Sequence, residues 1–139
     1  PTLKAPGSAG IQFEKDTLMD HAHTLAEQYI ATWNATDAAQ RQRLLQQVWT
    51  ADARYADPMA QAQTPQEIDA LIGAVQTRFD GFRFALAGKP DSHGTHLRFS
   101  WTLGPAAQPD LIQGTDFAEV EDGKLKSVTG FLDKVPSGA

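Results

Sequence analysis

Residues 96–103 have the sequence His96-Leu97-Arg98-Phe99-Ser100-Trp101-Thr102-Leu103, and this stretch decides the class of fold. Apolar and polar side chains alternate strictly along it, which is typical of a β-strand with one buried and one outward face. We therefore predict that Trp101 and the other apolar residues of the stretch pack against helices, because an apolar sheet face needs a covering layer. The outer face of the sheet is predicted to carry His96, Arg98, Ser100 and Thr102.

The same alternation continues on both sides of this stretch. Consecutive antiparallel strands are predicted at residues 82–86, 97–103, 111–120 and 124–135. A turn is predicted at residues 88–94, between the first two strands. Asp122-Gly123 is typical of a tight hairpin between the last two strands.

The N-terminal half has a helical period instead. From Thr17 onward, apolar residues recur at steps of three and four, namely Leu18, Ala22, Leu25, Tyr29 and Trp33. A second helix is predicted to end near Val48, and Thr64-Pro65-Gln66-Glu67 is a capping box that begins a third. A short strand at residues 53–57 lies between them and is closed by Pro58. The predicted fold is α+β, a cone-shaped, curved antiparallel sheet wrapped on three N-terminal helices.

The length and composition of the chain limit the classes of protein to which it can belong. The 139 residues suffice for one domain, which we place at residues 17–139 after an N-terminal arm at residues 1–16. The absence of cysteine excludes a disulfide framework and a thiol nucleophile and favours a reducing compartment. A net charge of −5 without a basic cluster argues against nucleic acid as a partner. No secretory signal pattern and no membrane-spanning run are found, so we expect a cytoplasmic protein with no membrane partner.

Neither a metal nor a cofactor is expected. His21 and His23 are two positions apart on a predicted helix, so their side chains diverge, and no other spacing is typical of metal ligands. The sequence also contains no glycine-rich phosphate loop and no nucleophile elbow.

Three polar residues occupy positions where this layout expects apolar ones. Tyr29 lies on the apolar stripe of the first helix, and Asp57 ends the short strand on the face of Tyr55. Asp116 shares a strand face with Ala118. A sheet curved over helices encloses an apolar pocket, and all three side chains could point into it.

Each of these three residues also has a purely structural interpretation. Tyr29 can be a core tyrosine with its hydroxyl at the rim. Asp57 can cap a turn, and Asp116 can face solvent or pair with Lys126 across the hairpin.

The order of elements and three motifs resemble the nuclear-transport-factor-2-like (cystatin-like) superfamily, and within it the bacterial ketosteroid isomerases and SnoaL-like proteins, over residues 17–135. Residues 28–34 look like the isomerase helix whose tyrosine donates a hydrogen bond to the substrate oxygen. Residues 53–58 look like the strand whose aspartate, also followed by proline, is the general base. Residues 115–120 look like the strand with a second, protonated aspartate of the oxyanion hole, and the hairpin at Asp122-Gly123 is one residue shorter here.

This resemblance implies Asp57 as the general base and Tyr29 and Asp116 as donors to the oxyanion. It implies proton transfer next to the carbonyl group of a small apolar ligand. Ligand-binding positions on the inner face are then Tyr55, Trp33, Phe99, Trp101, Phe84 and Ala118. It further implies a homodimer formed through the outer face of the sheet.

The same superfamily holds isomerases, cyclases, dehydratases, epoxide hydrolases and non-catalytic binders, so fold alone does not imply activity. One alternative is a non-catalytic ligand-binding or assembly module, in which Asp57 only caps the strand. Another is a SnoaL-like polyketide cyclase or hydrolase. Catalysis by the isomerase route requires the Asp57 carboxylate and the Tyr29 hydroxyl to converge on one cavity with room for a substrate.

Overall fold

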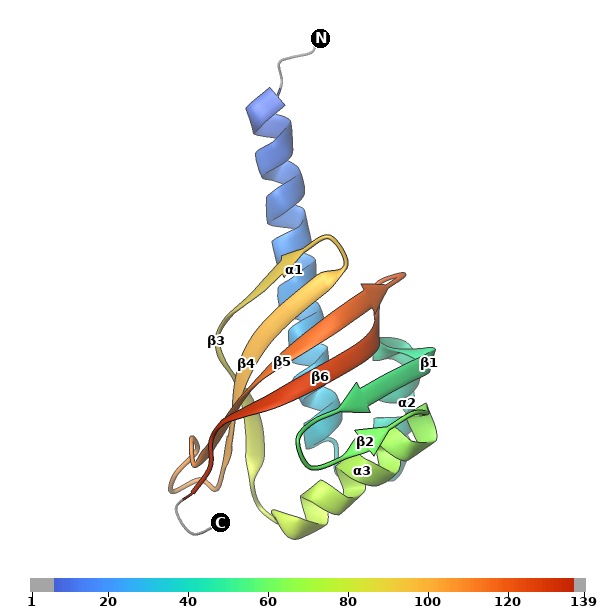
Figure 1. Cartoon of the computed structure of the whole chain (residues 1–139), viewed down its shortest axis with the longest axis vertical. Coiled ribbons are helices and arrows are strands. Elements are labelled where there is room, and N and C mark those ends of the chain that lie inside the picture. Colours follow the sequence, from blue (N-terminus) through green and yellow to red (C-terminus); the bar gives the residue numbers. More distant parts are fainter. Residues whose placement is uncertain (1–6, 137–139) are drawn as a thin grey trace.

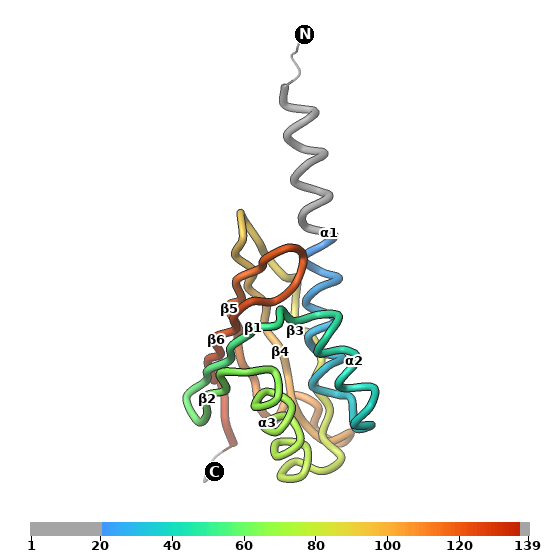
Figure 2. Tube along the Cα trace, turned by 90° about the vertical axis from the view of Figure 1, so that its right-hand side faces the viewer, coloured from blue at the N-terminus to red at the C-terminus, as the bar shows by residue number. Residues whose placement is uncertain are grey.

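The computed structural model describes the backbone of residues 7–136 and the side chains of residues 21–136. Its elements in chain order are α1 (Gly7–Asn34), α2 (Ala38–Val48), β1 (Trp49–Ala56), β2 (Gln61–Ala62), α3 (Pro65–Arg78), β3 (Arg83–His93), β4 (His96–Gly104), β5 (Ile112–Glu121) and β6 (Lys124–Lys134). Figure 1 looks onto the outer face of the curved sheet, with α1 behind it. Figure 2, turned by 90°, shows that the three helices cover one side of the sheet.

The six strands form one sheet in the order β2-β1-β6-β5-β4-β3. The predicted α+β class, a curved sheet on three helices, is confirmed. One strand pair departs from the predicted antiparallel pattern, because β1 runs parallel to β6. The chain passes through β2, α3 and three further strands before β6 returns to β1, and so long a connection permits a parallel neighbour. The sheet is therefore mixed.

The strand at residues 96–103 has the predicted faces. Leu97, Phe99, Trp101 and Leu103 are all buried in the core. The N-cap of α3 at Thr64 is also confirmed, because Glu67 N donates to Thr64 Oγ1. The Glu67 side chain accepts from Gln63 N, one residue before the N–H group that a capping box uses. Local chemistry therefore sets both the covered sheet face and the start of the helix that covers its edge.

Two strand boundaries differ from prediction. β1 begins at Trp49, directly after α2, whereas the sequence predicted a strand from residue 53. β3 continues to His93 through the predicted turn, and Gly88, with φ of 76°, accompanies a register shift against β4 at that point. A glycine with positive φ is compatible with a β-bulge as well as with a turn. The actual hairpin lies between His93 and His96.

The first helix begins at Gly7, before the predicted start at Thr17. The proposed arm, residues 1–16, lies outside the side chains that the structure describes, so the domain boundary stays a prediction. Among the described helices, none has both the length and the apolar character required to cross a membrane.

Candidate functional site

Asp116 is a carboxylate buried inside the cone, with 1% of its surface exposed. It points inward because buried and more exposed residues alternate along β5, and Asp116 lies on the buried face with Ala118. Tyr29 Oη, on α1, donates to Asp116 Oδ2 at 2.5 Å, and Trp101 Nε1, on β4, donates to Asp116 Oδ1 at 3.0 Å. Three elements distant in sequence thus bring two donors to one carboxylate.

Burial raises the pKa of Asp116 to about 6, because desolvation disfavours its charged form. The hydrogen bonds from Tyr29 and Trp101 act in the opposite direction, and the charges of Asp57 and Asp133 raise the pKa further. An acid with this pKa is mostly ionised at neutral pH. In the structure both oxygens of Asp116 accept hydrogen bonds, from Tyr29 and Trp101, and the protonated oxyanion donor that the resemblance implies stays a prediction.

Burial also raises the pKa of Tyr29 well above its ordinary value, as does the nearby charge of Asp116. The hydroxyl of Tyr29 lies inside the core and not at the rim, since Tyr29 is 3% exposed. The possible ion pair between Asp116 and Lys126 is not formed, because Lys126 instead bonds Glu121 at 3.0 Å. Among residues 21–136, no cluster of His, Asp and Glu could hold a metal ion.

Asp57 caps the turn between β1 and β2. Its Oδ1 accepts hydrogen bonds from the backbone N–H groups of Met59 at 2.7 Å and Ala60 at 2.8 Å. Its Oδ2 accepts from Tyr55 Oη at 2.6 Å, and its own N–H donates to Ala60 O. This geometry matches the turn-capping interpretation of Asp57, and every one of these bonds has a structural purpose.

The two carboxylates approach each other over Gly130 of β6. A Cβ atom at this position would lie 2.8 Å from Asp116 Oδ1, 3.4 Å from Asp57 Cβ and 3.5 Å from Tyr55 Oη. The absence of a side chain at Gly130 therefore creates the space in which the Tyr29–Asp116 and Tyr55–Asp57 pairs meet.

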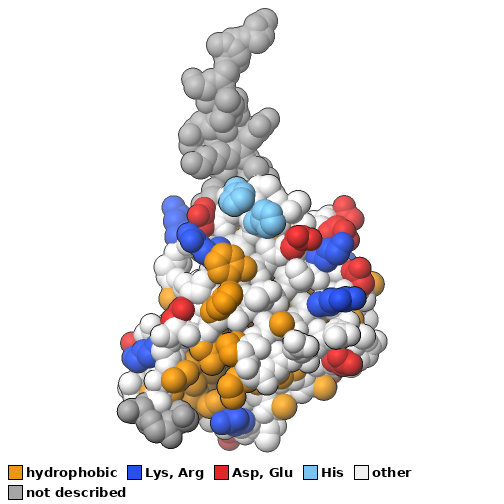
Figure 3. All heavy atoms as spheres, in the orientation of Figure 1, with side chains coloured by type: hydrophobic (Ala, Val, Ile, Leu, Met, Phe, Trp, Pro, Cys, Tyr) orange, Lys and Arg blue, Asp and Glu red, His pale blue; other side chains and the backbone are white. Residues whose placement is uncertain are grey.

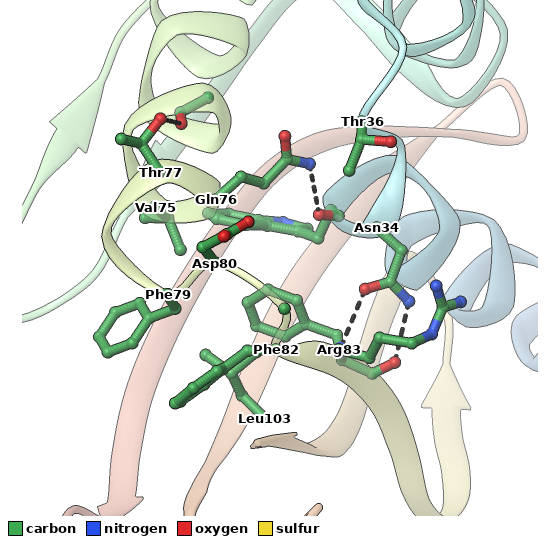
Figure 4. A pocket seen from close by; sticks show the side chains of 14 residues that line it. Asn34, Thr36, Val75, Gln76, Thr77, Phe79, Asp80, Phe82, Arg83 and Leu103 are labelled. Carbon is green, nitrogen blue, oxygen red and sulfur yellow. Dashed lines mark hydrogen bonds between the residues drawn. The ribbon is translucent and has the colours of Figure 1, made fainter. Parts of the chain in front are cut away.

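A cleft of about 730 Å³ opens where the C-terminal ends of α1 and α3 meet the start of β3. Its apolar wall consists of Trp33, Val75, Phe79, Phe82, Phe84 and Leu103. Figure 4 shows Asn34, Gln76 and Arg83 among the polar residues of this cleft. A second cleft of about 510 Å³ shares Asn34, Arg83 and Phe84 with the first.

An aromatic layer separates this cleft from the carboxylates. The Trp33 ring lies 5.3 Å from Phe84 and 5.5 Å from Tyr55, and Phe84 lies 5.4 Å from Trp101 (centroid distances). Tyr29, Asp57 and Asp116 line neither of the two clefts. The side chains as they lie thus do not place Asp57 and Tyr29 on one open cavity.

The six predicted ligand-binding residues divide into two groups. Trp33 and Phe84 line the cleft. The other four are buried behind that layer, namely Tyr55, Phe99, Trp101 and Ala118.

Two amides that the sequence analysis did not single out shape the cleft. Asn34 Nδ2 donates to Phe84 O, and Phe84 N donates to Asn34 Oδ1, both at 2.9 Å. Gln76 Nε2 donates to Trp33 O and Ala35 O at the end of α1 (Figure 4). Nothing in the sequence pattern pairs Asn34 with a strand 50 residues later.

The fold is that of a nuclear-transport-factor-2-like protein. A model of the SnoaL-like domain family matches residues 26–128, and the chain belongs to that family. A solved structure from Agrobacterium tumefaciens, described as a proposed isomerase of the SnoaL-like family, is 41% identical. The match covers 83% of this chain and 99% of that one, with a TM-score of 0.79.

More distant solved structures share the fold. A proposed ketosteroid isomerase from Kribbella flavida is 18% identical over 87% of this chain and 84% of its own, with a TM-score of 0.63. A proposed polyketide cyclase from Sinorhizobium meliloti is 12% identical over 77% and 93%, with a TM-score of 0.62. A comparison with curated proteins gave no match.

Proposed function

We propose that this chain is an isomerase-type enzyme that moves a proton next to the carbonyl group of a small apolar compound. The observation that carries the proposal is Asp116, a carboxylate inside an aromatic core with a pKa raised by burial to about 6. Keeping a charge there is costly, and a neutral acceptor would be enough to pair the buried donors of Tyr29 and Trp101. A base whose pKa lies near the working pH is suited to take a proton and return it.

Asp116 is the better placed of the two carboxylates for this exchange. Asp57 already has two backbone N–H groups and Tyr55 Oη as partners, all of which serve the turn. Asp116 has only side-chain donors, Tyr29 and Trp101. We therefore assign the proton transfer to Asp116 and give Asp57 the role of holding Tyr55 and tuning Asp116 through its negative charge.

The test is deuterium exchange from solvent at the carbon next to the carbonyl of β-tetralone, a two-ring ketone, followed by NMR. The uncatalysed exchange is subtracted with a protein-free sample. Asp116→Asn is expected to abolish the catalysed exchange and Asp57→Asn to leave a large part of it. Asp110→Asn, an exposed aspartate before β5, is the matched control. Loss of exchange in Asp57→Asn with retention in Asp116→Asn would instead support Asp57 as the base.

A second candidate, a non-catalytic ligand-binding module, is favoured by one observation. The aromatic layer of Trp33 and Phe84 covers the carboxylates, while the cleft itself is lined by apolar side chains. If the chain is such a binding module, apolar ring compounds should raise the melting temperature of the protein without any catalysed deuterium exchange. Exchange above the protein-free rate would reject it.

We also propose a homodimer through the outer face of the sheet. Phe117 and Phe131 lie on this face with ring centroids 5.8 Å apart, and each is about half exposed, at 48% and 50%. Figure 3 shows hydrophobic side chains gathered on the face viewed in Figure 1. A two-fold contact would bury such a pair against its own copy. Light scattering should give a dimer for the parent and for Met59→Lys, and a monomer for Phe117→Lys.

A further inference from the structure

The indole N–H of Trp33 is buried and has no hydrogen-bond partner. Trp33 is 4% exposed, and among the described side chains only Trp49 shares this property of an unpaired, buried indole nitrogen. Buried donors in native proteins are nearly always paired, so an orphan donor requires an explanation. Trp33 also lines the cleft, whereas Trp49 does not.

Trp33 lies where the cleft meets the carboxylate cluster. Its ring contacts Phe84 on the cleft side and Tyr55 and Tyr29 on the cluster side. Every other N–H or O–H group of this cluster is engaged, because Tyr29 and Trp101 donate to Asp116, and Tyr55 donates to Asp57. Trp33 and Trp49 thus carry the unpaired indole N–H groups among the described rings around Tyr29, and of these two only Trp33 also lines the cleft.

We propose that Trp33 Nε1–H donates a hydrogen bond to the oxygen of the ligand, so that the site takes flat, two-ring compounds with a carbonyl or enol oxygen. The catalytic part of this assignment rests on the proposed function. In that reaction the C–H bond next to the carbonyl breaks and the proton forms an O–H bond on the Asp116 carboxylate. The electron pair moves onto the ligand oxygen, where the indole N–H stabilises it. Return of the proton to carbon restores Asp116, with no net oxidation or reduction.

The surroundings of Trp33 support this role. The pKa of Tyr29 is raised first by burial and then by the charge of Asp116, and the N–H of Trp33 acts against both. The indole N–H of Trp33 thus faces the Tyr29 oxygen and lowers the pKa of Tyr29 by a weak hydrogen-bonding contact, although its geometry falls short of a full hydrogen bond. Because Nε1 is covered, an entering oxygen requires the half-buried ring of Phe84 to move. Asn34 bonds only the backbone of Phe84, whose ring packs against Trp33 and Trp101, so entry of the ligand oxygen has to displace these two ring contacts.

The test compares Trp33→Phe with Trp49→Phe. Both variants remove an unpaired indole N–H from a ring that contacts Tyr29, but only the first removes it from the cleft. The probes are β-naphthol, which has the shape of a tetralone enol, and naphthalene, which lacks the oxygen. Calorimetry or the fluorescence of the probe gives the two dissociation constants.

For Trp33→Phe, we expect affinity for β-naphthol to fall about tenfold, the factor that one hydrogen bond supplies, and affinity for naphthalene to stay within about twofold. Trp49→Phe should change neither. Equal losses for both probes, equal losses in both variants, or no binding of β-naphthol to the parent would overturn the assignment. If Trp33→Phe selectively loses affinity for β-naphthol but the parent protein catalyses no exchange, Trp33 is still the donor to the ligand oxygen. Only the proposed reaction is then refuted.

Discussion

Replacing Asp116 by asparagine should make the protein more stable while removing its proposed activity. The amide keeps the shape of the acid and can keep both hydrogen bonds. Its oxygen can accept from Trp101 Nε1, and its NH₂ group can donate to Tyr29 Oη, since a tyrosine hydroxyl accepts as well as donates. What the substitution removes is the buried negative charge.

The gain in stability of Asp116→Asn depends on pH, and the raised pKa of Asp116 determines the direction of this dependence. Between the ordinary value of 3.8 and about 6, the folded state binds the proton of Asp116 more tightly than the unfolded state does. The free energy of unfolding therefore falls as pH rises through this window. Above pH 6, ionised Asp116 lowers the free energy of unfolding by about 3 kcal/mol. This value follows from the difference between the two pKa values, since each pKa unit is worth about 1.4 kcal/mol.

Urea unfolding at pH 8 and pH 5 checks this prediction. Asp116→Asn should exceed the parent by about 3 kcal/mol at pH 8, and by roughly half that at pH 5, where the parent is largely protonated when folded. Asp110→Asn should show no such difference. A variant less stable than the parent at pH 8, or a gain independent of pH, would mean that the charge of Asp116 is not costly in the folded state.

Three further substitutions test the other parts of the cluster. Asp57→Ala should lower the free energy of unfolding by about 0.5–2 kcal/mol, since two backbone N–H groups of the turn lose their acceptor; a neutral effect in urea unfolding would contradict the capping role. Gly130→Ala should reduce the exchange rate and lower stability, because its Cβ would lie 2.8 Å from Asp116 Oδ1; unchanged kinetics would show that the carboxylates need not meet there. Trp101→Ala should lower the free energy of unfolding by about 3–5 kcal/mol, because a buried ring is lost. A variant with the same melting temperature as the parent would contradict this.

The fold was largely predictable because its decisive signals are local. Alternation along residues 96–103 identifies a strand and both of its faces, and the capping box at Thr64 identifies the start of α3. The parallel pairing of β1 with β6 was not predictable in the same way. It depends on where the chain returns after α3 and three strands, which no local period records.

The burial of Asp116 was predictable from the sequence, but its contacts were not. The pattern of β5 indicated that Asp116 shares a face with Ala118, and the structure gives both residues buried positions. The bond from Trp101 to Asp116 joins neighbouring strands, and that register can be known only from the sheet. The cleft was missed for a similar reason, since its lining residues come from helix ends and a strand start that are adjacent only in the folded chain.

The stability cost of Asp116 and its proposed usefulness have the same physical origin. The aromatic surroundings that raise its pKa also exclude water and strengthen any hydrogen bond made nearby. Tyr29 and Trp101 offset part of the cost, because their hydrogen bonds to the carboxylate lower its pKa against the effect of burial. Without these donors Asp116 would be a neutral core residue, and with a cation beside it Asp116 would be a permanent ion. Two neutral donors and the like charges of Asp57 and Asp133 leave it between these limits, which is the condition that reversible proton transfer requires.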